Sequence, residues 1–149
     1  MSQLDLGSVR IDVDERFRLN TLVLVSDGTE ASDPTVSGNY RASFVLTTSG
    51  RPVPAAELEA YVEAEVKKIQ QLPGFSQLAR EAASSQTGAP AILQRHAFKD
   101  GRGTQLEQLQ AFVVGKDAVL IGTATHVSGA PFTAMETTFR KMLLSLQPR

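Results

Sequence analysis

Hydrophobic and polar residues alternate with a period of two in the first half of the chain. Residues 9–13 alternate between aliphatic and charged side chains, which is typical of a strand with one buried face. Residues 22–25 form a continuous run of β-favouring apolar side chains, as expected for a strand that is covered on both faces. A loop over 26–38, rich in Asp, Ser, Thr, Gly and Pro, leads to a third strand over 40–47.

The next pattern has the spacing of a helix. Pro54 has the fixed backbone angle that suits a first helical position, and Pro73-Gly74 ends the pattern. Between them, apolar residues recur on one helical face: Leu58, Tyr61, Val62, Val66, Ile69 and Leu72. The sequence therefore predicts an amphipathic helix between these two boundaries.

The second half contains three clearer strands. Residues 75–89 predict only a short strand followed by a polar loop, whereas 91–98, 105–114 and 118–126 are strongly β-favouring. The connections between these three segments are short, and parallel strands need a crossover of about a dozen residues or more. We therefore expect two consecutive antiparallel hairpins.

A second helix is predicted to begin at Pro131. Its apolar stripe consists of Phe132, Met135, Phe139, Met142, Leu143 and Leu146. Runs of strands separated by single helices are typical of an α+β fold with an antiparallel sheet. The sequence thus predicts one domain over 1–149, with a sheet of about six strands and two main helices packed on it.

Composition removes several classes of function. The chain has 149 residues, with 15 Lys and Arg against 16 Asp and Glu, and a formal net charge of −1. A nucleic-acid partner is not expected, because binding to phosphates needs an excess of basic residues. The sequence contains no cysteine, which excludes disulfides, thiolate metal ligands and a cysteine nucleophile.

The N-terminal residues lack the basic and apolar regions of a secretory signal. No stretch reaches the roughly 18 consecutive apolar residues that a membrane-spanning helix requires. We therefore expect a cytoplasmic protein that is not inserted in a membrane.

Candidate catalytic chemistry is sparse. His96 and His126 are the only histidines, and they lie on different predicted strands without a second histidine at metal-ligand spacing. The pattern G-x-S-x-G of a nucleophilic serine does not occur, and the glycines at 101 and 103 precede a strand rather than a phosphate-binding helix. We predict no catalytic residue, no metal and no cofactor. An enzyme with dispersed residues around either histidine is the weakest alternative.

The strand over 105–114 has an unusual distribution of amides. Its even-numbered positions share one face, by the period of two: Leu106, Gln108, Gln110, Phe112 and Val114. The odd-numbered positions 109, 111 and 113 are apolar and are expected to face the helices. Two amides among apolar side chains can satisfy polar groups of a ligand on an otherwise apolar surface. The competing interpretation is that both glutamines simply point to solvent.

The order of elements and three local patterns resemble the PsbP/DcrB-like family of α+β domains. The patterns are FVLT at 44–47 with the helix that follows at 58–62, GxxLxQxQxF at 103–112, and FxxMLxSL at 139–146. Together they extend over nearly the whole chain, and none is a catalytic signature. The resemblance implies a two-helix antiparallel α+β fold and a protein that binds rather than catalyses.

Within that family the chain is most similar to the Eag-type chaperones of bacterial type VI secretion. This similarity implies a cytoplasmic homodimer that binds and shields the N-terminal transmembrane helices of a secreted effector and aids its loading onto the secreted spike. It places a client-binding groove on Leu22, Leu24, Val45, Gln108, Gln110 and Phe112. The phase of the second strand stays open, because Val23 and Val25 compete with the two leucines. The alternative is an accessory module of the same fold whose partner is a folded protein.

Overall fold

The computed structural model of the chain describes residues 2–5, 9–15, 17–20, 23–26, 36–38 and 40–148. The helical elements are the 3-10 turn η1 (Ala55–Glu57), α1 (Leu58–Ile69) and α2 (Ala130–Leu144). The strands of the largest sheet are β3 (Phe17–Asn20), β4 (Val23–Ser26), β7 (Ser43–Thr48), β8 (Ser76–Ser84), β9 (Pro90–Lys99), β10 (Gln105–Val114) and β11 (Val119–Val127). Shorter strands are β1 (Ser2–Asp5), β2 (Val9–Val13), β5 (Val36–Ser37), β6 (Tyr40–Arg41) and β12 (Gln147–Pro148).

The large sheet is antiparallel throughout. Its seven strands pair in the order β3-β4-β7-β11-β10-β9-β8. The predicted hairpins β9–β10 and β10–β11 are both present. The prediction of an α+β fold with two helices on an antiparallel sheet is therefore confirmed. The sheet is larger than expected, because β3 was not predicted and the weak segment after α1 forms a nine-residue strand, β8.

Helix α2 covers one face of this sheet. Its buried residues are Phe132, Met135, Phe139, Met142 and Leu143, as the apolar stripe predicted. They pack against apolar sheet residues that include Phe44, Leu109, Ala111 and Val113. The approach is close at Gly122, where a Cβ atom would lie 2.7 Å from Leu143 Cδ2, so a side chain at this position would push the helix away from the sheet.

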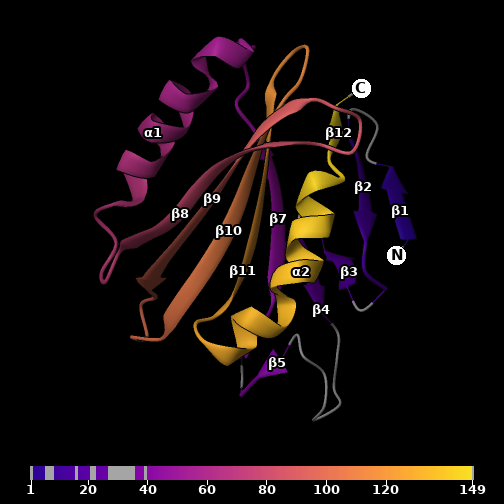
Figure 1. Cartoon of the computed structure of the whole chain (residues 1–149). Helices are drawn as coiled ribbons and strands as arrows, with labels where there is room; N and C mark the ends of the chain where they lie inside the picture. Colours follow the sequence, from indigo (N-terminus) through magenta and orange to yellow (C-terminus); the bar gives the residue numbers. More distant parts are fainter. Residues whose placement is uncertain are drawn as a thin grey trace.

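Helix α1 lies on the opposite face of the sheet from α2 (Figure 1). Its buried residues Leu58, Val62 and Val66 form a separate apolar cluster with Ile92 and Phe112. The expectation that the apolar face of β10 meets both helices was thus wrong, since α1 takes the face that carries the glutamines. Each helix must bury its own apolar stripe, and each of the two faces of the sheet covers one of these stripes.

Two boundaries also differ from the predicted ones. Helix α1 ends at Ile69, and Leu72, predicted to belong to its apolar stripe, is 38% exposed in the turn before β8. Strand β12 extends the chain beyond α2 and pairs with β2, which in turn pairs with β1. This small sheet adds Ile11 and Val13 to the core beside α2, and the Asp12 amide donates a 2.8 Å hydrogen bond to Ser145 Oγ.

Candidate binding face

The sheet surface opposite α2 carries the polar residues that the sequence singled out. We call it the glutamine face and define it by Val45, Gln94, His96, Gln108, Gln110, Phe112, Thr123 and Thr125. The register aligns these residues in rows across the strands. Gln94, Gln110, Thr123 and Val45 form one row, because each is directly paired with the next. Directly paired residues share a face of the sheet, so the predicted alternation of β10 is confirmed.

The first row is tied to α1 by Arg80 of β8. Its Nε donates to Gln94 Oε1 at 2.8 Å, and its Nη1 donates to Glu63 at 2.7 Å and to Glu59 at 3.1 Å. Further along the row, Gln110 Nε2 donates to Thr123 Oγ1 at 3.1 Å. Ion pairs therefore reinforce the apolar contact that holds α1 over this end of the face.

The second row is a continuous hydrogen-bonded chain. His96 Nε2 lies 2.8 Å from Gln108 Oε1, and Gln108 Nε2 donates to Thr125 Oγ1 at 3.0 Å. The imidazole is fully buried beside Phe75 and Phe98, whose ring centroids lie 5.6 and 6.2 Å away. Burial lowers the pKa of His96, which the hydrogen bond to Gln108 offsets only in part.

In the described part of the chain, His96 hydrogen-bonds to the Gln108 amide and not to a carboxylate or another titratable side chain. His126 is buried and stacks on Tyr40 at 6.0 Å between ring centroids. Among the described residues, no group of His, Cys, Asp and Glu is arranged to hold a metal ion.

Only part of the glutamine face is accessible to a ligand. Val45, Gln108, Gln110 and Thr123 are partly exposed, so the structure brings three of the predicted groove residues together at the surface. Phe112 belongs to the same face but is 1% exposed, because α1 covers it and Tyr61 meets its ring edge-on at 6.3 Å. Phe112 therefore supports the covered end of the face rather than its open part.

The remaining predicted groove residues lie on or beside β4. Leu22 is outside the described residues. The backbone of Leu24 pairs with Phe44, a residue of the α2 face, whereas Val23 pairs with Val45. The phase of the side chains at 22–25 stays a prediction.

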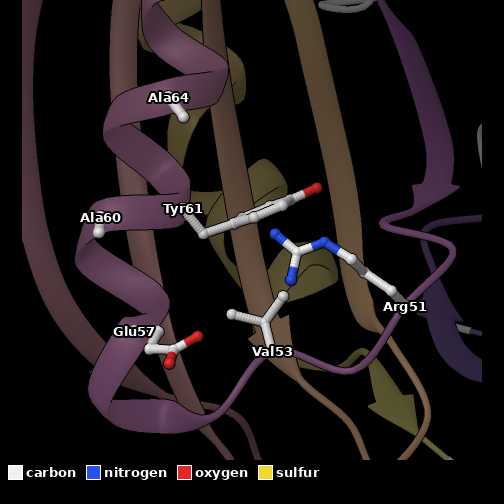
Figure 2. A pocket seen from close by; sticks show the side chains of 6 residues that line it. All are labelled: Arg51, Val53, Glu57, Ala60, Tyr61 and Ala64. Carbon is white, nitrogen blue, oxygen red and sulfur yellow. The ribbon is translucent and has the colours of Figure 1, made fainter.

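A pocket adjoins the covered end of the face and was not predicted from the sequence. It encloses about 230 Å³ and is lined by Arg51, Val53, Glu57, Ala60, Tyr61 and Ala64. Figure 2 shows the Tyr61 ring reaching from α1 across the strands, with the Arg51 guanidinium beside it; the guanidinium carbon lies 5.7 Å from the ring centroid. Burial, followed by the charge of Glu65, raises the pKa of Tyr61. The pocket joins residues from the loop before η1 and from α1, which no local sequence pattern links.

The α2 face carries its own buried charges, in a different role. Arg95 donates to Glu107 Oε2 at 2.7 and 3.0 Å, and Glu107 Oε1 accepts from Ser128 Oγ at 2.7 Å and from the Gly129 amide at 3.3 Å. Burial alone would raise the pKa of Glu107, but these hydrogen bonds and the charge of Arg95 lower it. The carboxylate therefore connects β10 to the start of α2. It already accepts four hydrogen bonds within the protein, whereas the amides on the other face remain accessible to a ligand.

Comparison with known proteins shows the fold. No protein-family model and no curated protein matches the sequence. Among solved structures, the chain is similar to protein PA94 of Pseudomonas aeruginosa, described as of unknown function, with 23% identity, a TM-score of 0.67, and coverage of 100% of this chain and 97% of the other. It also resembles the Ran-binding protein Mog1p of Saccharomyces cerevisiae (9% identity, TM-score 0.64, covering 99% and 94%). The third is the PsbP protein CyanoP of Synechocystis sp. PCC 6803 (10% identity, TM-score 0.53, covering 98% and 95%).

These similarities place the chain in the PsbP/Mog1-like fold, as the sequence predicted. At such low sequence identity they establish the architecture alone, and the function must be inferred from the residues of the site. Among the helices of the described residues, none is long and apolar enough to cross a membrane.

Proposed function

We propose that this protein is a non-enzymatic binding module whose glutamine face covers an apolar segment of a partner protein. The observation that carries the proposal is the accessible pair Gln108 and Gln110. Each amide is held by a threonine hydroxyl of β11, yet each remains partly exposed, as does Val45 on the same face. A catalytic site would instead place titratable groups in hydrogen-bonding reach of one another.

The physical chemistry of such a face suits a largely apolar ligand with a few polar atoms. Covering apolar surface in water is favourable by roughly 25 cal/mol per Å². Polar atoms of the ligand lose their water when they are covered, and this loss is costly unless a hydrogen bond replaces it. Two amides offer both donors and acceptors for that purpose.

The family resemblance specifies the partner further. We propose that the ligand is the N-terminal transmembrane segment of a type VI secretion effector, which the protein shields in the cytoplasm as a homodimer and helps to load onto the secreted spike. Small and hydroxyl-bearing residues are common at transmembrane helix interfaces, and the amides of the glutamine face can hydrogen-bond to them. No cofactor or nucleotide is needed for this role.

A second candidate is a module that binds a folded protein. The similarity to Mog1p, a Ran-binding protein, favours it, because the same architecture there serves recognition of a folded partner. The two candidates differ in the state of the ligand. A chaperone binds an isolated apolar segment, whereas an adaptor of this kind needs the intact partner.

Co-expression with an effector that carries N-terminal membrane segments tests the proposal. We expect the two proteins to co-purify, and Val45→Asp to abolish the complex because it places a charge on the accessible part of the glutamine face. Gln86→Ala, an exposed glutamine outside the face, is the matched control and should leave the complex intact. Binding that survives Val45→Asp would contradict the placement of the ligand.

The homodimer is tested separately by light scattering on the purified wild-type protein. A mass of about twice 16.0 kDa supports it. A monomer that still retains the effector contradicts the dimer while leaving the binding face in place.

A further inference from the structure

The two partly exposed glutamines of the face, Gln108 and Gln110, are not equivalent in their hydrogen bonding. Gln110 has a threonine hydroxyl as its partner, and a hydroxyl both donates and accepts. The Gln110 amide can therefore present either its nitrogen or its oxygen to Thr123. Gln108 has the same kind of partner in Thr125 and a second one in His96.

His96 fixes the orientation of the Gln108 amide. An amide oxygen only accepts hydrogen bonds, so the contact of 2.8 Å with Gln108 Oε1 requires the proton of the neutral imidazole on Nε2. Nδ1 then carries a lone pair, and this buried atom has no hydrogen-bond partner among the described residues. The opposite tautomer would bury an N–H donor without a partner at Nδ1, which proteins avoid more strictly than an unpaired acceptor.

The surroundings of His96 hold the ring in this orientation. It is fully buried and contacts the rings of Phe75 and Phe98. With one lone pair of Oε1 engaged by His96 and one Nε2 proton engaged by Thr125, the Gln108 amide retains one oxygen lone pair and one N–H, and this N–H is the only donor that it can offer to a ligand. This donor lies on a partly exposed side chain, so a ligand that covers it must supply an acceptor.

We infer that His96 is a specificity-determining positioning residue, which fixes Gln108 as a hydrogen-bond donor and selects apolar segments that carry a hydroxyl or carbonyl acceptor. The inference rests on the proposed function, because it assigns the chemistry of the ligand bound by that face. Gln110 adds an adaptable partner about 6.8 Å along the same strand. One hydroxyl that accepts from the first amide and donates to the second spans about 4.7 Å, because its two hydrogen bonds meet at a roughly tetrahedral angle.

Two soluble probes separate this selectivity from plain hydrophobic binding. Both are lysine-flanked helices of leucine and alanine, and in one of them every fourth residue on one side is serine in place of alanine. Fluorescence anisotropy gives the affinity of each probe. We expect the wild-type protein to bind the serine probe about fivefold to tenfold more tightly, the range of one net neutral hydrogen bond.

The variants isolate the role of the imidazole. His96→Phe retains an aromatic ring beside Phe75 and Phe98 but cannot donate to Gln108, so the preference for the serine probe over the alanine probe should fall below about twofold. His96→Gln restores an N–H donor at a similar reach and should restore the preference. Thr137→Val, on the exposed surface of α2 and outside the glutamine face, is the matched control and should keep it.

Nitrogen NMR of the imidazole in the free protein tests the geometry without any probe and does not depend on the folding of a variant. An Nε2-protonated neutral ring supports the inference, and an Nδ1-protonated ring overturns it. Equal affinity of the wild-type protein for both probes, or a preference that survives His96→Phe, also overturns it while leaving the proposed function intact. A wild-type protein that binds neither probe contradicts the proposed function, and with it the role of His96.

Discussion

The two faces of the large sheet differ in how completely a helix covers them. On the α2 side, alternate residues of β10 are Leu109, Ala111 and Val113, and one long helix covers them completely. On the other side, the alternating positions include Gln108 and Gln110, and α1 covers only the end at Phe112. Alternate residues of β10 thus belong to two different faces. One face stabilises the fold, and the other has hydrogen-bonding groups that are free to bind a ligand.

This difference distinguishes stability from function in the same element. Side chains on the α2 face are buried among apolar neighbours, so replacing them lowers the free energy of unfolding. The accessible amides of the glutamine face contribute little to the folded state beyond their neutral hydrogen bonds, two for Gln108 and one for Gln110. If the account is correct, equivalent substitutions on neighbouring residues of β10 have opposite consequences.

The largest effect is expected from exchanging an apolar residue for an amide on the α2 face. Val113 is fully buried and pairs with Ala91 and Leu120. Val113→Gln combines overpacking with a buried amide that lacks a partner, and should lower the free energy of unfolding by about 3–5 kcal/mol. The reciprocal change on the other face, Gln110→Leu, should alter it by less than about 1 kcal/mol. Denaturant unfolding measures both, and similar losses in the two variants would remove the distinction between the faces.

A smaller effect concerns the protonation of His96. Because burial lowers its pKa below the ordinary value of 6.5, the neutral ring is favoured in the folded protein. Its contribution to stability is therefore complete above about pH 6.5 and is lost as the pH falls toward the folded pKa, by at most about 1.4 kcal/mol per pH unit. Denaturant unfolding between pH 7.5 and 5 should show a steeper loss for the wild-type protein than for His96→Gln. Parallel curves would mean that His96 is not held neutral.

The smallest effect is expected at the ion pairs that join α1 to β8. The Arg80 side chain is 14% exposed, but those of Glu59 and Glu63 are 67% and 45% exposed, so solvent weakens the attraction. Arg80→Leu should cost about 0.5–1 kcal/mol. Hydrogen exchange should locate this cost in the amides of α1, with α2 unchanged. Equally faster amide hydrogen exchange in both helices would contradict the idea that α1 packs on the sheet independently of α2.

Local patterns in the sequence predicted much of this comparison. The two-residue period of β10 placed both glutamines on one face and the aliphatic residues on the other, because strand geometry alone decides that alternation. The apolar stripe of α2 likewise identified the residues that are buried. The side of the sheet that α1 occupies was not predictable, since an amphipathic stripe states that a helix is covered and not by which face.

The contacts that complete the site depend on register between distant segments. The bond from His96 to Gln108 requires β9 and β10 to pair at these two residues, and a shift by one would separate them. Arg80 meets Glu63 only because β8 forms the edge of the sheet beneath α1, and its alanine-rich sequence has a weak β pattern. Composition only removed classes of function, and the family resemblance implied a binding role, but the orientation of the amides appeared only in the structure.

Mapping the surface that contacts an apolar ligand tests the central claim most directly. Backbone amide NMR shifts can be followed while the lysine-flanked leucine–serine helix is added to the wild-type protein. The account predicts that the shifts change at Val45, Gln108, Gln110 and Thr123, and that those of Leu109, Val113 and Phe139, on the α2 side, stay constant. Changes confined to the α2 side, or the absence of any change at saturating probe, would contradict the assignment of the glutamine face as the binding site.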